Sequence, residues 1–362
     1  MTRARTWLWA MILLTLAAVA AAVLLAPPSG ASPIRALSWL LFTGSSVHVA
    51  STGWLFSVPA VRAYGRKHRV RCLWVPVGLV AIAAAAAAAI SPMTFQWLLL
   101  PYFGWQLFHY QKQNIGMAAL AASAGRVQAL RPVERWSLLV AGLSGIAALI
   151  ARPDQLGLQV GPAGPVAPMV FLLAAATFAV SAAAGIAALT RRPRAQRPAG
   201  FSAAYLTALL FFVPAFVFGS PYAAVGGLTI AHGLQYLLLV TLIAGGIPAR
   251  AATSAQAPPA STGLSRALRL MLLANVAFIG GALLSWASHL HDAGPAGRLV
   301  FGAYLGVVMA HFVIDAGLWR MRDPLARNIL ITHLPYLVPA KPTTALVNAA
   351  TDRSAADIGC RA

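Results

Sequence analysis

The chain has 362 residues, of which 59% are hydrophobic and only 9% are charged, with 27 Lys and Arg against 7 Asp and Glu. Soluble globular proteins carry about 25% charged and about 45–50% apolar residues. The composition therefore excludes a water-soluble enzyme and a disordered polypeptide. The formal charge of +20 lies in short basic clusters between apolar stretches of membrane-spanning length. We therefore expect a lipid bilayer as the partner, and no nucleic acid.

A membrane-spanning helix needs about 20 mostly apolar residues. Ten segments meet this requirement and predict an all-α, polytopic transmembrane helical bundle of about ten helices: residues 7–26, 36–60, 72–90, 94–115, 136–151, 166–189, 201–219, 222–247, 267–290 and 299–320. The first could instead be a secretory signal, although its apolar core is longer than usual. We expect one transmembrane domain over residues 1–324. Residues 325–362 are expected to form a cytoplasmic tail that is partly amphipathic and then disordered.

Lys and Arg fall in alternate connections between these segments. With the N-terminus inside, the cytoplasmic connections hold nearly all of them, and the opposite side receives only Arg35, Arg152 and Arg298. This bias predicts a multi-pass protein of the inner (cytoplasmic) membrane with both termini in the cytoplasm. The two cysteines, Cys72 and Cys360, have no partner at metal-ligand spacing.

Four of the eight histidines lie inside the predicted spans: His48, His109, His232 and His311, on the second, fourth, eighth and tenth. All four spans run from outside to inside. Each histidine lies about 10–15 residues from the outer end, which is roughly 15–22 Å of helix. Four imidazoles on four helices are therefore expected to share one depth near the bilayer midplane. The other four histidines are expected to be solvated or interfacial.

Each of these histidines belongs to a polar stripe, since side chains at i, i+3 and i+4 share a helix face. In chain order the stripes are Ser45, His48, Ser51 and Thr52; Gln106, His109, Lys112, Gln113 and Asn114; Thr229, His232, Gln235 and Tyr236; and His311 with Asp315. Polar stripes face lipid only at a large cost, so we expect the four helices to turn them toward a shared interior. Asp315 is the only carboxylate within the predicted spans.

Neutral imidazole is the commonest metal ligand, and its second nitrogen usually needs an orienting partner. Thiolates and bridging carboxylates are absent from the stripes, which disfavours iron–sulfur and carboxylate-bridged di-iron sites. A His-rich site with open positions suits Fe(II) binding dioxygen, or copper. A haem b held by two of the four histidines remains open. So do a proton or ion pathway and a purely structural polar core.

We interpret His48, His109, His232 and His311 as the metal ligands. Asp315 would orient His311 or supply a fifth ligand, and with Tyr236 it is the candidate catalytic residue. Gln113 and Gln235 are the candidate residues for supporting the bound cofactor.

Three windows carry a resemblance to a known family: Gly44-Ser-Ser-Val-His48, Phe108-His109-Tyr110-Gln111 and His232-Gly-Leu-Gln-Tyr236. They resemble the Gly-x-x-His-Gly, His-Phe-Gly and His-Ser-x-x-His motifs of the Brp/Blh-type β-carotene dioxygenases of bacteria and archaea. The resemblance implies a polytopic protein that holds iron through transmembrane histidines and cleaves a carotenoid. The first window is one residue longer than the motif, and Tyr236 stands in place of the last histidine. We assign His311 as the replacement for that missing ligand, and this assignment is not part of the resemblance. Phe108–Gly116 and His311–Pro324 are similar to motifs of an uncharacterised bacterial membrane family.

The sequence thus predicts a membrane non-haem iron oxygenase acting on an apolar lipid or isoprenoid, a carotenoid-like small molecule that enters from the bilayer. The alternatives are a haem-binding membrane electron carrier, and a transporter or channel with a structural polar core. No pattern indicates an oligomeric state.

Overall fold

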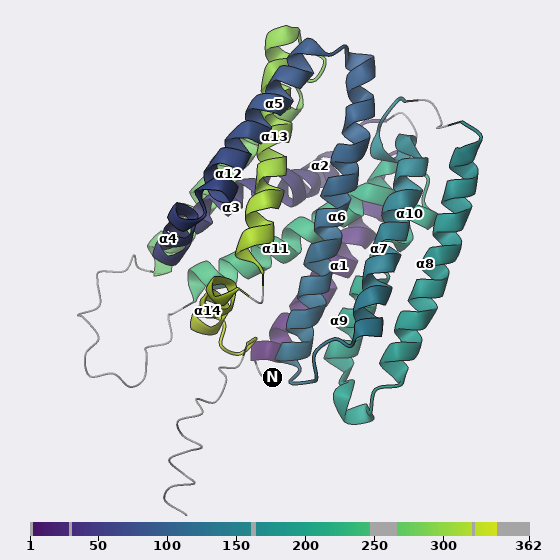
Figure 1. The fold of residues 1–362 in the computed structure, drawn as a ribbon, viewed down its shortest axis with the longest axis vertical. Coiled ribbons are helices and arrows are strands. Elements are labelled where there is room, and N and C mark those ends of the chain that lie inside the picture. The colour runs from purple at the N-terminus through teal and green to yellow at the C-terminus, as the bar shows by residue number, and fades with distance from the viewer. Residues whose placement is uncertain (1–2, 29–30, 161–163, 247–265, 321–322, 339–362) are drawn as a thin grey trace, which may run out of the picture.

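The structure is a computed structural model that describes residues 3–28, 31–160, 164–246, 266–320 and 323–338. These residues form helices and turns, with no strand among them (Figure 1). The elements are α1 (Arg3–Leu24), α2 (Arg35–Phe42), η1 (Thr43–Val47), α3 (His48–Leu55), α4 (Pro59–Lys67), η2 (Val70–Trp74), α5 (Val75–Ala89), α6 (Pro92–Ala124), α7 (Pro132–Ala151), η3 (Pro153–Leu156), α8 (Val166–Thr190), η4 (Arg194–Gln196), α9 (Ala199–Leu209), α10 (Val213–Val217), η5 (Tyr222–Gly226), α11 (Gly227–Gly245), α12 (Arg266–Ser288), α13 (Pro295–Leu318) and α14 (Pro324–His333). The predicted all-α bundle is confirmed.

Seven of the described helices are long and apolar enough to cross a membrane, so the chain is a membrane protein. They are Arg3–Leu24, Val70–Ala89, Pro132–Ala151, Val166–Thr190, Tyr222–Gly245, Arg266–Ser288 and Pro295–Leu318. The other three predicted spans are also helical. The second consists of α2, η1 and α3 in succession, the fourth lies within the long and more polar α6, and the seventh divides into α9 and α10. The total of ten spans stays a prediction.

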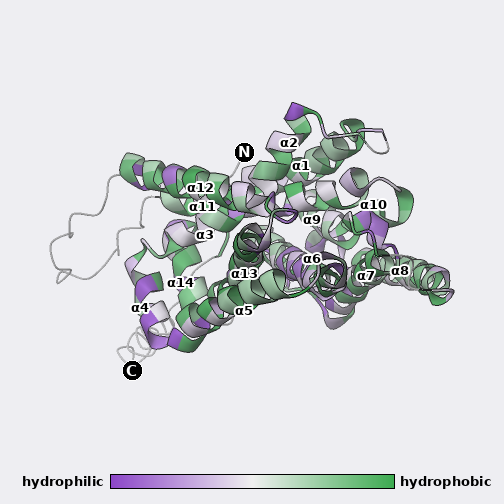
Figure 2. Cartoon of the chain, turned by 90° about the horizontal axis from the view of Figure 1, so that it is seen from above, coloured by the Kyte–Doolittle hydropathy of each residue, from purple (hydrophilic) through white to green (hydrophobic). Residues whose placement is uncertain are grey.

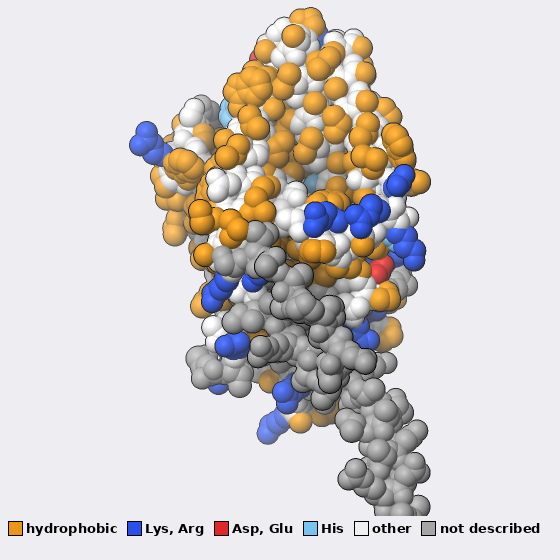
Figure 3. All heavy atoms as spheres, turned by 90° about the vertical axis from the view of Figure 1, so that its left-hand side faces the viewer, with side chains coloured by type: hydrophobic (Ala, Val, Ile, Leu, Met, Phe, Trp, Pro, Cys, Tyr) orange, Lys and Arg blue, Asp and Glu red, His pale blue; other side chains and the backbone are white. Residues whose placement is uncertain are grey.

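The helices form a bundle with α5 and α13 at one side, α7 and α8 at the other, and α6 between them (Figures 1 and 2). The connections α5–α6, α7–α8 and α12–α13 lie at the upper end in Figure 1, and the connections α6–α7 and α8–α9 lie at the lower end. Lys and Arg gather in the lower half of the face in Figure 3, below a broad apolar surface. This separation agrees with the predicted alternation of basic connections.

Glycines and alanines produce the most extensive helix pair, α5 with α13. A Cβ on Gly302 would collide with the Ala83 carbonyl, and one on Gly306 with the Cα of Val80. Small residues let membrane helices approach closely and gain van der Waals contact. Ala83, Ala84 and Ala87 of α5 are the residues that lie closest to Gly302 of α13.

A buried ion pair joins two connections at the lower end. Helix α7 begins at Pro132, four residues before the predicted span, so Glu134 lies in its first turn. The fifth predicted span therefore began too late, and the observed helix adds Glu134 to Asp315 as a carboxylate on a helix of membrane-spanning length. Arg192 donates from Nε and Nη2 to the two Glu134 oxygens at 2.6 Å each. It also donates to the carbonyls of Gln128 and Ala129, at 3.0 Å each. The pair therefore holds the α6–α7 connection against the α8–α9 connection.

The first part of the expected tail packs on the bundle. Ala326, Ile329 and Leu330 of α14 are buried, and the helix contacts α11 and α4. The remainder of the tail, residues 339–362 with Cys360, lies outside the described residues.

Replacing Gly306 by valine should destabilise the fold, because the new side chain must separate α13 from α5. Overpacking typically costs about 1–3 kcal/mol, so the thermal unfolding midpoint in detergent should fall. Gly78→Ala on α5 is the control, since a Cβ there meets nothing within 4 Å. Equal midpoints for the two variants would contradict the close packing.

Candidate metal centre

Four separate elements bring the four predicted histidines together in the interior. His48 is the first residue of α3, His109 lies on α6, His232 on α11 and His311 on α13. Their side chains are between 1% and 9% exposed. The expected common depth is therefore found in the structure, and the rings also meet laterally.

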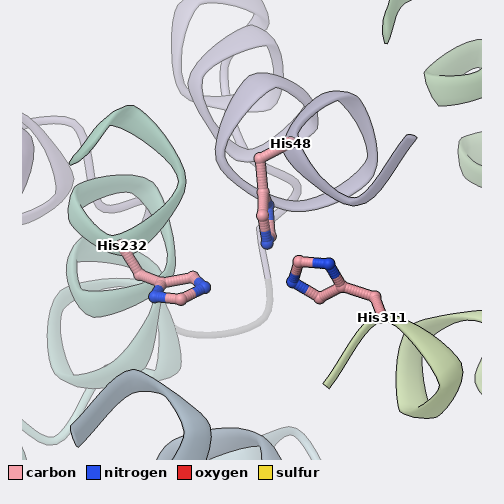
Figure 4. A group of neighbouring side chains, drawn as sticks. All are labelled: His48, His232 and His311. Atoms are coloured by element: carbon pink, nitrogen blue, oxygen red, sulfur yellow. The ribbon is translucent and has the colours of Figure 1, made fainter. Parts of the chain in front are cut away.

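The four imidazoles form a closed ring of edge-to-face contacts. Ring centroids are separated by 4.9 Å for His48 and His232, 5.0 Å for His232 and His109, 5.0 Å for His109 and His311, and 5.1 Å for His311 and His48. The interplanar angles are 73–88°. Figure 4 shows His48, His232 and His311 extending from three helices toward one point.

Six nitrogens of these rings are buried and have no protein hydrogen-bond partner: both nitrogens of His48 and of His232, and Nε2 of His109 and of His311. A buried polar atom without a partner costs about 1–3 kcal/mol. Such groups are rare in folded proteins and usually mark a bound ion, a water or a functional role. The residues therefore fit a metal cation, which would be bound by these nitrogens.

Two overlapping sets of side chains could hold a metal ion. The candidate ligand atoms of His48, His232 and His311 all lie within 4.8 Å of one another, and so do those of His109, His311 and Asp315. Two ligands of one ion stand roughly 3–4 Å apart when each bond is about 2.0–2.2 Å long. His311 belongs to both sets, so it is the common residue of the site.

A backbone contact between two glycines sets the distance between His48 and His232. A Cβ on Gly44, in η1, would collide with the backbone of Ile230, and a Cβ on Gly233 would collide with the backbone of Gly44. Gly233 directly follows His232, and Gly44 precedes His48 by about one helical turn. Because neither glycine has a side chain, the two backbones touch and the two imidazoles reach each other.

A hydrogen-bonded network closes the side of the centre that faces the lower end. The Thr52 hydroxyl lies 2.8 Å from Nδ1 of His311 and 2.7 Å from the Tyr236 hydroxyl. Tyr236 donates to Oδ1 of Asp315 at 3.2 Å. Oδ2 of Asp315 lies 3.8 Å from Nε2 of His311. Asp315 and Tyr236 thus lie at the predicted site, and Thr52 supplies the direct contact that orients His311.

Two aromatic rings cover the imidazoles, and sequence reasoning assigned neither of them to the site. Tyr110 stacks on His232 with centroids 4.1 Å apart, and its hydroxyl accepts from Gln106 at 2.6 Å. Phe312 stacks on His109 with centroids 4.7 Å apart. Each is the next residue after a site histidine, which is the only signal the sequence offers for them.

The predicted cofactor-supporting glutamines lie beside the backbone of His232. Gln113 donates to the His232 carbonyl at 2.9 Å and to Gln235 at 3.0 Å. Gln235 in turn donates to the Thr15 hydroxyl of α1 at 2.9 Å. These contacts tie α6, α11 and α1 together. Their contribution is to the position of α11, which carries His232.

The remaining predicted polar residues divide between the site and its surroundings. Ser51 donates to the His48 carbonyl at 2.6 Å. Asn114 is buried in α6, and Lys112 is exposed. His68, His289 and His291 are exposed, as expected for histidines outside the site, whereas His333 is half-buried and its Nδ1 is buried without a hydrogen-bond partner.

No protein-family profile, curated protein or solved structure matches the chain. Its function is therefore inferred from the geometry of this centre.

Substituting Thr52 by valine keeps the side-chain shape and removes the hydroxyl that contacts His311. Loss of such an orienting partner typically lowers metal affinity by about 10–100-fold, which competition with a chelator would measure. Thr207→Val is the control, because that hydroxyl donates to the Ala203 carbonyl of its own helix, α9. Equal metal affinity in both variants would contradict the role of Thr52.

Proposed function

We propose that the protein is an integral membrane non-haem iron oxygenase that acts on an apolar lipid or isoprenoid. His48, His109, His232 and His311 would hold the iron. The observation that carries the proposal is the closed ring of four buried imidazoles, six of whose nitrogens lack a protein partner. The resemblance of three windows to the carotenoid-cleaving dioxygenases supports the same chemistry.

The second ligand set favours iron among the candidate metals. Two histidines with one carboxylate are the ligands of many Fe(II) oxygenases, which keep open positions for dioxygen and substrate. His109, His311 and Asp315 provide this set. A bound iron would supply the capacity to bind and activate dioxygen. The chain would contribute the ligands, their orientation and the exclusion of water.

The surroundings of His109 support entry of an apolar substrate from the bilayer. Trp105 is 37% exposed on the surface of α6. Its ring lies 5.7 Å from that of Phe312, which stacks on His109. These two aromatic rings thus form a continuous contact from the exposed surface of α6 to the imidazole of His109. An apolar molecule could approach along them without crossing the polar network around Asp315.

The ring spacing argues against a haem in this interior. A bis-histidine haem places two imidazoles on opposite faces of a wide planar macrocycle. Here each imidazole lies about 5 Å from two others. The four side chains themselves fill the space that a porphyrin would need.

A proton or ion pathway is the second candidate. Polar side chains continue from the imidazoles in both directions, through Gln106 and Ser45 toward the upper end and through Gln113 and Gln235 toward the lower end. Chains of this kind are used by relays. A relay needs no stoichiometric metal, so metal analysis distinguishes it from the oxygenase.

Protein purified in mild detergent should contain stoichiometric iron, measured by elemental analysis, and no Soret band. His48→Ala and His311→Ala should each deplete the metal, because each removes a ligand. The exposed His289 gives the control His289→Ala, which should keep it. Stoichiometric metal in both ligand variants would contradict the ligand set, and a metal-free wild type would contradict the whole proposal.

Iron-loaded protein should transfer oxygen to an apolar molecule. Incubation with isotopically heavy dioxygen and either β-carotene or a total lipid extract should yield labelled apolar products, detected by mass spectrometry and absent with His311→Ala. Bound iron with no labelled product from either substrate source would refute the oxygenase while leaving the metal centre in place.

A further inference from the structure

A small cavity lies beside His48, one of the four imidazoles. It has a volume of about 20 Å³. His48 and Phe312 line it together with Ser45, Ser46, Gln106 and Val308, among others. Gln106 precedes His109 by three residues and Val308 precedes His311 by three, so the cavity lies on the upper side of the centre. A water molecule needs roughly 10–15 Å³ by this measure. The cavity therefore has room for one small molecule.

The cavity wall offers a free acceptor. The amide nitrogen of Gln106 donates to the Tyr110 hydroxyl at 2.6 Å, but the Gln106 Oε1 atom is buried and has no protein partner. A buried acceptor of this kind is normally satisfied by a water or a ligand. The free acceptor thus suits a small hydrogen-bond donor such as water, and the small volume excludes a hydrocarbon chain.

Side chains lie against the imidazoles on their other sides. Thr52, Tyr236 and Asp315 occupy the lower side and are each at most 4% exposed. Tyr110 covers the face of His232, and Phe312 covers the face of His109. The cavity is therefore the empty space that remains next to His48.

We infer that this cavity receives the exogenous ligand of the centre, a molecule of one to three heavy atoms such as water or the dioxygen that would replace it. The inference rests on the proposed function, since it assigns the open coordination position of the metal. Its size excludes the apolar substrate from the same position. The substrate must then reach the centre from another direction, past Trp105 and Phe312.

Azide titration tests the assignment on metal-loaded protein with its metal oxidised, because a metal-bound azide gives a charge-transfer absorption band for iron and copper alike. Val308→Leu adds a methylene group to the cavity and should weaken azide binding by about tenfold, with metal content unchanged. Val307→Leu, the next position on α13, does not line the cavity and should bind azide like the wild type. Val308→Ala enlarges the cavity and should retain binding.

The outcomes separate the two proposals. If the wild-type protein binds stoichiometric metal but no azide, or if Val308→Leu binds azide as tightly as Val307→Leu, the cavity assignment is wrong and the metal centre stands. Equal losses in Val308→Leu and Val308→Ala would also overturn it, because filling and emptying the cavity should act in opposite directions. If the wild type binds no metal, the proposed function fails and the cavity assignment fails with it.

Discussion

An imidazole that loses its water inside a bilayer must gain another partner, and this requirement organises the interior of the protein. Four helices turn their polar stripes inward, so that the apolar side chains of the same helices face lipid. Hydrogen bonds within the chain satisfy the surrounding polar groups, including Thr52, Tyr236 and Gln113. They leave the imidazoles only partly satisfied. Six of the fourteen buried side-chain polar atoms that lack a hydrogen-bond partner in the described residues belong to these four imidazoles, and this concentration at one place fits a ligand.

Close backbone contacts make this interior possible. Imidazole side chains are short, so four of them meet only if their helices approach closely. Gly44 and Gly233 provide that approach between η1 and α11, and Gly281 lets α12 pack against Val47 on the other side of the same turn. Gly302 and Gly306 bring α13 onto α5. Helix association in lipid depends on such packing, because lipid tails are as apolar as the side chains. The glycines therefore contribute to the fold and to the site at once.

The site could be predicted because helix rise and helix periodicity can be read directly along the sequence. Helix rise converts residue number into depth in the bilayer, so counting along the spans predicted one depth for His48, His109, His232 and His311. The i, i+4 spacing predicted that Asp315 shares a helix face with His311. Tyr110 and Phe312 were not predicted, because a stacking partner depends on how each helix is rotated about its axis. Glu134 was placed outside a helix, although Arg131-Pro132 followed by a glutamate is typical of a helix N-terminus. Its pairing with Arg192 requires the α6–α7 connection to meet the α8–α9 connection, and a local sequence pattern carries no information about such a long-range contact.

The π-helical turn η1 lies where the first window is one residue longer than the family motif. The motif separates glycine and histidine by three positions, whereas Gly44 and His48 are separated by four. Residues Thr43–Val47 form a π-turn that ends where His48 begins. A π-turn holds about one residue more than an α-turn, and such turns occur often at functional sites. An added residue absorbed there would keep Gly44 against α11 and His48 toward the other imidazoles. The π-turn therefore lets Gly44 contact α11 while His48 reaches the other imidazoles.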